Sequence, residues 1–171
     1  MGLHFDIRYG DRIQLSLGRI MREHEIPGLA VGIVEDGKVT CAFGLGVMRI
    51  GEDKPITPET LFHMASITKP FVATSIMQLV ERGLLDLDSP VASYLPYFTL
   101  DDPRGASITV RQMVTHTSGI PDVQDYLWNR PEYDDGALER YVHSISDQAL
   151  LGDPGSEFRY SNMAFEVLGD L

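Results

Sequence analysis

Ser66 and Lys69 are the first residues in the sequence whose types and spacing could do chemistry. They lie in the segment MASITKPF, at the start of a strongly apolar stretch. On a helix, residues three positions apart share one face with β-carbons roughly 5–6 Å apart, so the amine could take the hydroxyl proton. A lysine can act as that base only where burial or a positive field lowers its pKa. The alternative is that Ser66 only caps a helix, and the pair alone leaves both interpretations open.

Two further features favour a chemical role. Pro70 directly follows Lys69, and a proline is tolerated only in the first turn of a helix, so the pair is expected at an exposed helix end. Much later in the chain, Tyr160 and Asn162 stand at a predicted junction between a loop and a helix. A phenol can accept and return a proton, and an amide can donate and accept hydrogen bonds. The alternative for these two residues is a half-buried aromatic side chain and a helix cap.

The predicted secondary structure must position these residues. Apolar periodicity predicts helices over 11–25, 66–82, 90–94 and 137–146, and another helix that begins at Ser161. Two β-rich runs on either side of Asp36-Gly37 predict a hairpin. The capping-box sequence at 109–112 predicts a helix that closes at 117–119, and Gly83 is expected to end the 66–82 helix.

Other residues that could react or bind are interpreted structurally. The histidines lack the paired spacing of a zinc site, so neither a metal nor a cofactor is predicted. His116 near a helix end is expected to hydrogen-bond free carbonyls rather than to serve as a base, and Ser118 is expected to be a turn residue. Cys41 is expected to be a small buried apolar residue. Three aromatic residues of the surface segment 121–135 either line a substrate cleft or fix that segment: Tyr126, Trp128 and Tyr133.

Composition limits the class of protein. The chain has 171 residues, 43% hydrophobic and 23% charged, a balance typical of one soluble globular domain. Its net charge of −11 argues against a nucleic-acid partner, because binding to phosphates depends on clustered Lys and Arg. Residues 1–28 show neither a signal peptide nor a transmembrane stretch, so we expect a cytoplasmic protein with no membrane partner.

Four phrases, in order, resemble signatures of the serine β-lactamase-like superfamily: TLFHMASITKPFVA, GLLDLDSPV, ITVRQMVTHTSGIPD and PGSEFRYSNMAFEVLG. Ser66 and Lys69 match the S-x-x-K motif, and Tyr160 and Asn162 form Y-x-N where some relatives carry S-D-N. The chain is most similar to the branch of class C β-lactamases, family VIII esterases and D-aminopeptidases, which are relatives of penicillin-binding proteins. The match runs from about residue 27 to the last residue.

The resemblance implies an α+β fold of the β-lactamase-like type, an antiparallel sheet flanked by helices plus a helical subdomain. Residues 1–171 would form an incomplete domain of this kind. Its N-terminal helix and hairpin would occupy 1–50, and its helical active-site region 60–171.

The resemblance also implies roles for the candidate residues. Ser66 would be the acylated nucleophile, with its backbone N–H forming half of the oxyanion hole, and Lys69 would be its general base. Tyr160 would shuttle protons, and Asn162 would hold the carbonyl or amide of the substrate. The implied substrate is a small ester, lactam or amide, hydrolysed through an acyl-enzyme without a metal or cofactor.

One part of the family pattern is missing. In the family a third motif, of the type K-T-G or H-x-G, follows Y-x-N on a strand that forms one wall of the active site, and none follows Tyr160 here. We therefore expect the N-terminal portion of a longer enzyme, truncated before the C-terminal strands. The sheet edge left unpaired predicts self-association or pairing with a complementing C-terminal segment.

Two functional hypotheses remain open. The first is a serine hydrolase, with esterase slightly preferred over β-lactamase or D-aminopeptidase because no export signal is visible. The second is a truncated or degenerate domain that binds a ligand or partner without turning it over. The sequence leaves open whether the 171-residue chain is itself active.

Overall fold

The computed structural model describes residues 7–126 and 128–171. Residues 1–6 lie outside the described residues, and they are part of the segment 1–28 from which a cytoplasmic protein was expected. Leu127, in the predicted surface segment 121–135, also lies outside them. The chain divides into two units, Met1–His63 and Met64–Leu171.

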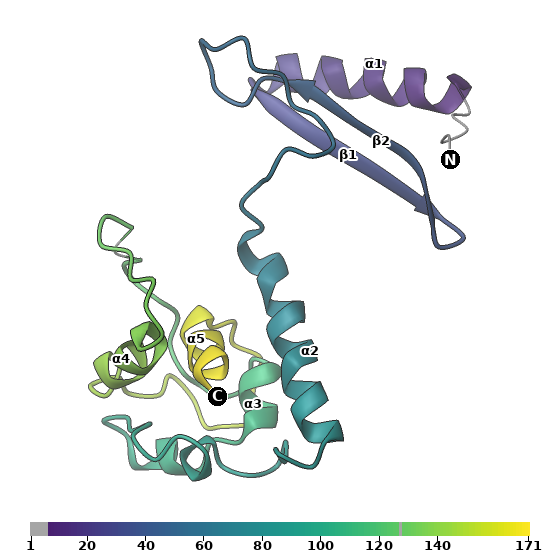
Figure 1. Cartoon of the computed structure of the whole chain (residues 1–171). Helices are drawn as coiled ribbons and strands as arrows, with labels where there is room; N and C mark the ends of the chain where they lie inside the picture. The colour runs from purple at the N-terminus through teal and green to yellow at the C-terminus, as the bar shows by residue number, and fades with distance from the viewer. Residues whose placement is uncertain (1–6, 127) are drawn as a thin grey trace. The chain divides into compact units, whose positions relative to one another are not determined.

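The N-terminal unit places a helix against a two-stranded antiparallel sheet (Figure 1). Its elements are α1 (Ile7–Glu23), β1 (Gly28–Glu35) and β2 (Lys38–Gly46). Asp36 and Gly37 join the strands with φ angles of 50° and 73°, as the mirror-image turns of tight hairpins require. The predicted hairpin is therefore confirmed, and so is the predicted helix over 11–25, which begins earlier, at Ile7.

A small core holds this unit together. Its buried apolar residues come from α1, β2 and the loop after β2: Met21, Cys41, Phe43 and Ile56. Cys41 is a free, buried thiol, as expected. The loop lies so close to β2 that a β-carbon at Gly44 would sit 2.1 Å from the carbonyl oxygen of Ile56, so only glycine fits there.

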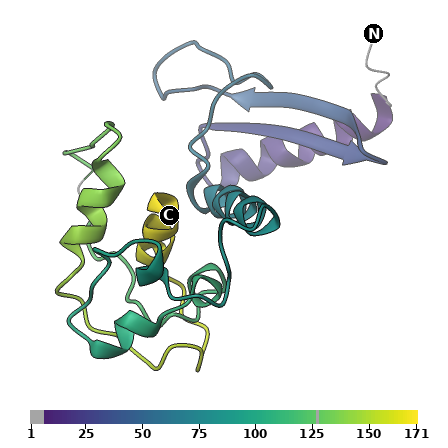
Figure 2. The ribbon, with the colours of Figure 1, turned by 60° about the horizontal axis from the view of Figure 1, so that its bottom comes forward.

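Four α-helices dominate the described part of the C-terminal unit, residues 64–126 and 128–171: α2 (Thr68–Glu81), α3 (Val110–Val114), α4 (Ala137–Ser144) and α5 (Asn162–Asp170). The helix α5 contacts the other three, and Figure 2, in which α2 is seen end-on, shows α5 between α2 and α4. Most of its residues are buried, and the fully buried ones include Ala164 and Val167. This central position makes α5 the element around which the unit packs.

The helix α2 starts and stops where its sequence requires. Pro70 lies in its first turn, where the missing N–H costs no hydrogen bond. At the other end Gly83 has a φ of 69°. The N–H groups of Gly83 and Leu84 donate to the carbonyls of Val80 and Leu79, which is the Schellman pattern. The prediction that Gly83 ends this helix is confirmed.

The helix predicted from the capping box is present but shorter than expected. Thr109 and Gln112 each accept a hydrogen bond on the side chain from the backbone N–H of the other residue. The helix α3 ends at Val114, before the predicted closure at 117–119, because His116 adopts a left-handed φ of 57° that turns the chain away.

Among the residues of this unit that the structure describes, three short 3₁₀ helices are also present: η1 (Ala65–Ile67), η2 (Val91–Ser93) and η3 (Pro103–Ser107). The prediction of a short helix over 90–94 is wrong in extent, because η2 is one 3₁₀ turn. Pro96 follows closely, and a proline disfavours helical backbone in the residue before it.

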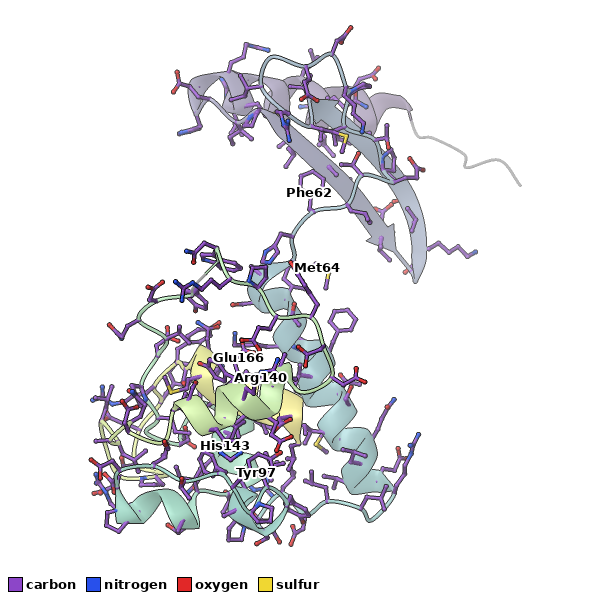
Figure 3. The ribbon with its side chains drawn as sticks, turned by 60° about the vertical axis from the view of Figure 1, so that its left-hand side comes forward. Phe62, Met64, Tyr97, Arg140, His143 and Glu166 are labelled. Atoms are coloured by element: carbon purple, nitrogen blue, oxygen red, sulfur yellow. The ribbon has the colours of Figure 1, made fainter. Side chains whose placement is uncertain are left out.

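The core of the C-terminal unit is continuous and much larger than that of the first unit. Its fully buried side chains come from the loops as well as the helices and include Val91, Ile108, Val110, Met113 and Val142. At its edge Tyr97 stacks on His143, with ring centroids 5.0 Å apart. Both residues are labelled in Figure 3. Across residues 7–126 and 128–171, no helix is long and apolar enough to cross a membrane.

Candidate active site

Ser66 lies in η1, immediately before α2. Its hydroxyl oxygen is 2.5 Å from the phenolic oxygen of Tyr160 and accepts a hydrogen bond from Lys69 Nζ at 3.4 Å. The N-cap residue of α2 is Ile67, whose side chain is apolar. The interpretation of Ser66 as a helix cap is therefore wrong, and its hydroxyl faces an amine and a phenol instead.

The backbone just before Ser66 is strained. Ala65 has a φ of 46°, a left-handed conformation that residues with a β-carbon rarely adopt. Such a conformation costs on the order of 1–3 kcal/mol and is concentrated at functional sites. Here it forms the turn that projects Ser66 ahead of the helix.

Lys69 is half-buried between polar and aromatic groups. Its Nζ donates a short hydrogen bond to Asn162 Oδ1 in addition to the bond to Ser66. The nitrogen lies 4.9 Å from the ring centroid of Tyr160 and 5.4 Å from that of Phe165. The negative faces of both rings favour a cation at this point.

Tyr160 connects these groups. Its hydroxyl lies 2.5 Å from Ser66 Oγ and donates to Asn162 Oδ1 at 3.2 Å. Burial acts to raise the pKa of the Tyr160 phenol, but the neighbouring Lys69 and the hydrogen bond with Ser66 outweigh it, so the pKa lies below its ordinary value. A phenol of this kind gives up its proton more readily than one in water.

All four predicted residues thus meet in one place. Ser66 lies in η1 and Lys69 in the first turn of α2, while Tyr160 lies just before α5 and Asn162 is the first residue of α5. The contact between α2 and α5 positions the two pairs relative to each other.

A loop between α3 and α4 fixes the start of α5. The N–H of Arg159 donates to the carbonyl of His116 at 2.7 Å, and the Ser161 hydroxyl donates to the carbonyl of Pro121 at 2.8 Å. The same Ser161 oxygen accepts the N–H of Ala164 and so caps α5. The predicted start of this helix is confirmed, and the loop holds it on both sides of Tyr160.

His116 contributes to this arrangement in an unexpected way. Its Nδ1 accepts the N–H of Ser161 at 3.2 Å, and its ring lies against that of Tyr160 with centroids 4.5 Å apart. The expected hydrogen bond from this side chain to a free carbonyl is therefore wrong for Nδ1, which is an acceptor. Burial, followed by the charge of Lys69, lowers the pKa of His116 below 6.5. The turn role expected for Ser118 is confirmed, since its buried hydroxyl accepts the N–H of Ile120.

Asp122 is a residue of the site that the sequence did not single out, whereas Tyr126 was one of the candidates for lining a substrate cleft. Asp122 Oδ1 accepts both the backbone N–H of Asn162, at 2.8 Å, and its side-chain amide, at 3.0 Å. The amide also donates to the Tyr126 hydroxyl at 2.6 Å. Tyr126 stacks on Trp128 with centroids 5.4 Å apart, so this aromatic pair borders the site, whereas Tyr133 is 90% exposed.

Glu166 is the second residue that the sequence did not single out. It lies on α5 one turn beyond Asn162, is half-buried and is labelled in Figure 3. Burial raises the pKa of its carboxyl above 4.5, although the charge of Lys69 opposes this. The spacing Asn162 to Glu166 places both on one helix face, which is the signal that could have identified it.

The arrangement can perform proton transfer to and from a serine hydroxyl. It joins a hydroxyl, a phenol, an ammonium and an amide through direct hydrogen bonds. Within the described residues, 7–126 and 128–171, no group of three or more His, Cys, Asp or Glu could hold a metal ion.

Comparison with known proteins identifies the family of this chain. The sequence model of the beta-lactamase family matches residues 16–171. The chain belongs to the beta-lactamase family. Protein flp of Staphylococcus aureus (strain NCTC 8325 / PS 47) is 32% identical to it over 153 residues, which are 87% of this chain and 30% of that protein.

Solved structures of this family share the fold. The octameric penicillin-binding protein homologue from Pyrococcus abyssi matches 97% of this chain and 38% of its own, with 31% identity and a TM-score of 0.81. EstCE1, a hydrolase with promiscuous acyltransferase activity, matches 94% of this chain and 45% of its own, with 31% identity and a TM-score of 0.79. The β-lactamase-like α+β fold is thus confirmed, and the chain spans about a third of the length of protein flp and less than half of each matched structure.

Proposed function

We propose that this protein is a serine hydrolase that cleaves a small ester or amide through an acyl-enzyme on Ser66. The observation that carries the proposal is the contact of Ser66 Oγ with the Tyr160 hydroxyl at 2.5 Å, beside the Lys69 ammonium. A serine needs an adjacent proton acceptor to become a nucleophile, and the Tyr160 oxygen beside Ser66 can be that acceptor.

In the proposed acylation, Tyr160 acts as a phenolate paired with Lys69. Ser66 Oγ attacks the acyl carbon while its proton passes to the Tyr160 oxygen. The same proton then moves to the leaving alkoxide or amine as its bond to the acyl carbon breaks, and Ser66 is left as an ester. In hydrolysis, water attacks that ester and gives a proton to Tyr160, which returns it to Ser66 Oγ as the carboxylic acid departs.

The geometry favours Tyr160 over Lys69 as the direct proton acceptor. The phenolic oxygen is the nearer of the two to Ser66 Oγ, at 2.5 Å against 3.4 Å. Lys69 also donates to Asn162, a bond that its charged form makes best. We therefore assign to Lys69 the role of holding a positive charge beside Tyr160 and Ser66, in place of the general-base role that the resemblance implies.

The substrate class rests on the relatives. EstCE1 is described as a hydrolase with promiscuous acyltransferase activity, which favours an ester substrate, whereas the penicillin-binding homologue favours a lactam or amide. We propose an ester as the preferred substrate. The roles of Asn162 in holding the substrate and of the Ser66 N–H in an oxyanion hole are part of this proposal.

Ester hydrolysis tests the proposal. We expect the chain to release nitrophenol from p-nitrophenyl butyrate faster than its Ser66→Ala variant. Ser75→Ala is a matched control, because Ser75 is an exposed serine of α2, the helix that directly follows Ser66, and its hydroxyl donates to the Phe71 carbonyl. Equal rates for the folded wild type and Ser66→Ala would reject catalysis and favour a domain that binds without turnover.

A further inference from the structure

The orientation of the Asn162 amide decides whether its oxygen or its NH₂ group faces the Lys69 ammonium. An amide carries an acceptor oxygen on one side and a donor NH₂ on the other. In the observed orientation the oxygen accepts from Lys69 and, in the protonated form of the phenol, from Tyr160. If the amide were reversed, its NH₂ would face the ammonium, and the bonds that hold both groups beside Ser66 would be lost.

Asp122 is the group that forbids this reversal. An ionised carboxylate can only accept hydrogen bonds, and its Oδ1 lies 3.0 Å from Asn162 Nδ2. A reversed amide would place its oxygen against this carboxylate, which is repulsive. Tyr126 supports the same orientation, since its hydroxyl accepts the amide at 2.6 Å.

Asp122 is itself held in place by backbone groups. Its Oδ1 also accepts the N–H of Val123 at 2.9 Å and the N–H of Asn162 at 2.8 Å. The preceding residue, Pro121, accepts the Ser161 hydroxyl, so the carboxylate is attached to the start of α5 through the backbone as well. The half-buried side chain therefore has little freedom to follow a moving amide.

We propose that Asp122 is a positioning residue of this site, which orients the Asn162 amide and through it the Lys69 ammonium and the Tyr160 phenol around Ser66. The inference rests on the proposed function but assigns to Asp122 no contact with the reacting atoms. Misplacement of a catalytic group by about 1 Å can cost on the order of 10²-fold in rate. Asp122→Ala should therefore slow acylation of Ser66 by about 10²-fold.

A double-mutant cycle with Asn162 tests this route. The rate of Ser66 labelling by a fluorophosphonate is measured by intact mass for wild type, Asp122→Ala, Asn162→Ala and the double variant. If Asp122 acts through Asn162, the double variant reacts at the rate of Asn162→Ala alone. If the double variant reacts more slowly than Asn162→Ala by the full factor that Asp122→Ala alone causes, the two residues act independently and the proposal is overturned. A wild-type labelling rate in Asp122→Ala would also overturn it. Asp122→Asn, which keeps an acceptor oxygen, should restore part of the rate.

A second measurement separates this inference from the proposed function. The side-chain NH₂ signals of Asn162 are identified by NMR through their loss in Asn162→Ala. In the wild type we expect them to be slow in hydrogen exchange, and in Asp122→Ala to shift and exchange faster. If the wild type is not labelled, the proposed function fails, and the NMR signals alone then decide whether Asp122 orients the Asn162 amide. Signals unchanged by Asp122→Ala would then reject the positioning role, and shifted signals would support it.

Discussion

At the scale of single residues, the reactivity of Ser66 depends on the phenol beside it. The pKa of Tyr160 lies below 10 because Lys69 and Ser66 stabilise the phenolate more than burial disfavours it. A fluorophosphonate should therefore label Ser66 faster as the pH rises toward that pKa, since the fraction of phenolate grows.

We predict that Tyr160→Phe removes this pH dependence. Loss of a general base typically costs about 10²–10⁴-fold, so labelling at neutral pH should fall by that order. The measurement is the labelling rate against pH by intact mass, with Tyr133→Phe as control because Tyr133 is 90% exposed. An identical rise with pH in Tyr160→Phe would show that another group takes the proton.

A second prediction at this scale concerns acid stability. His116 accepts the Ser161 N–H and its pKa is lowered below 6.5 by burial and by Lys69, although Asp122 acts in the opposite direction. The unfolded chain then binds more protons than the folded chain just below pH 6.5, so stability should fall as the pH decreases through this window. The free energy of unfolding in urea, measured between pH 7.5 and 5.5, should decrease less in His116→Gln than in wild type. A parallel decrease in both proteins would contradict this role of His116.

At the scale of elements, the cap of α5 links stability to the site. Ser161 is fully buried, accepts the Ala164 N–H and donates to the Pro121 carbonyl. Ser161→Ala should lower the free energy of unfolding by about 1–3 kcal/mol, because a cap is lost and a carbonyl is left without its donor. Urea unfolding checks this, with the exposed Ser146→Ala as control. A change as small as that of the control would show that the cap is dispensable.

The glycine that ends α2 gives a prediction that can be compared with the same substitution at a helical glycine. Gly83 has a φ of 69°, so Gly83→Ala should destabilise the C-terminal unit by about 1 kcal/mol. Gly169 lies in α5, where alanine is the better helix former and its β-carbon would be 3.4 Å from the Leu138 side chain, an ordinary contact. Gly169→Ala should therefore not destabilise the protein. Equal losses in urea unfolding would contradict the assignment of the Schellman motif.

Local signals in the sequence predicted most of these elements. The Asp36-Gly37 turn, the Thr109 capping box, Gly83 and the Ser161 cap each act on their immediate neighbours, so their effect can be read from adjacent residues. The early end of α3 could not be predicted, because the left-handed His116 is held by long-range bonds to Arg159 and Ser161.

In the candidate site, too, only the contact between neighbours in sequence could be predicted from the residues themselves. Ser66 and Lys69 share one helical turn, so their meeting follows from spacing. Their meeting with Tyr160 needed the family resemblance, and Asp122 was missed because its partner, Asn162, is distant in sequence. No local pattern distinguishes an aspartate that orients an amide from one that is solvated.

At the scale of the whole molecule, each unit has its own buried core. The first centres on Met21, Cys41, Phe43 and Ile56, and the second on the residues packed around α5. The sequence contains one cysteine, Cys41, which lies in the first unit, and the helices α2, α3, α4 and α5 lie in the second, so each unit carries its own probe of unfolding.

We predict that the two probes report different unfolding midpoints. Reaction of the Cys41 thiol with a disulfide reagent follows opening of the first unit. Trp128 is 74% exposed, so the second unit is followed by the circular dichroism of its helices. The smaller core should open at lower urea concentration, because it buries less apolar surface. Coincident midpoints would mean that the two units unfold as one cooperative body.

The most direct test of the account is the site of acylation. Purified chain is exposed to a fluorophosphonate, its intact mass is measured, and the modified peptide is sequenced by mass spectrometry, with circular dichroism to show that each variant is folded. The account predicts one adduct per chain, on Ser66, absent from Ser66→Ala and retained in Ser75→Ala. A folded wild-type chain that carries no adduct, or carries it on another residue, would contradict the claim that Tyr160 and Lys69 activate Ser66.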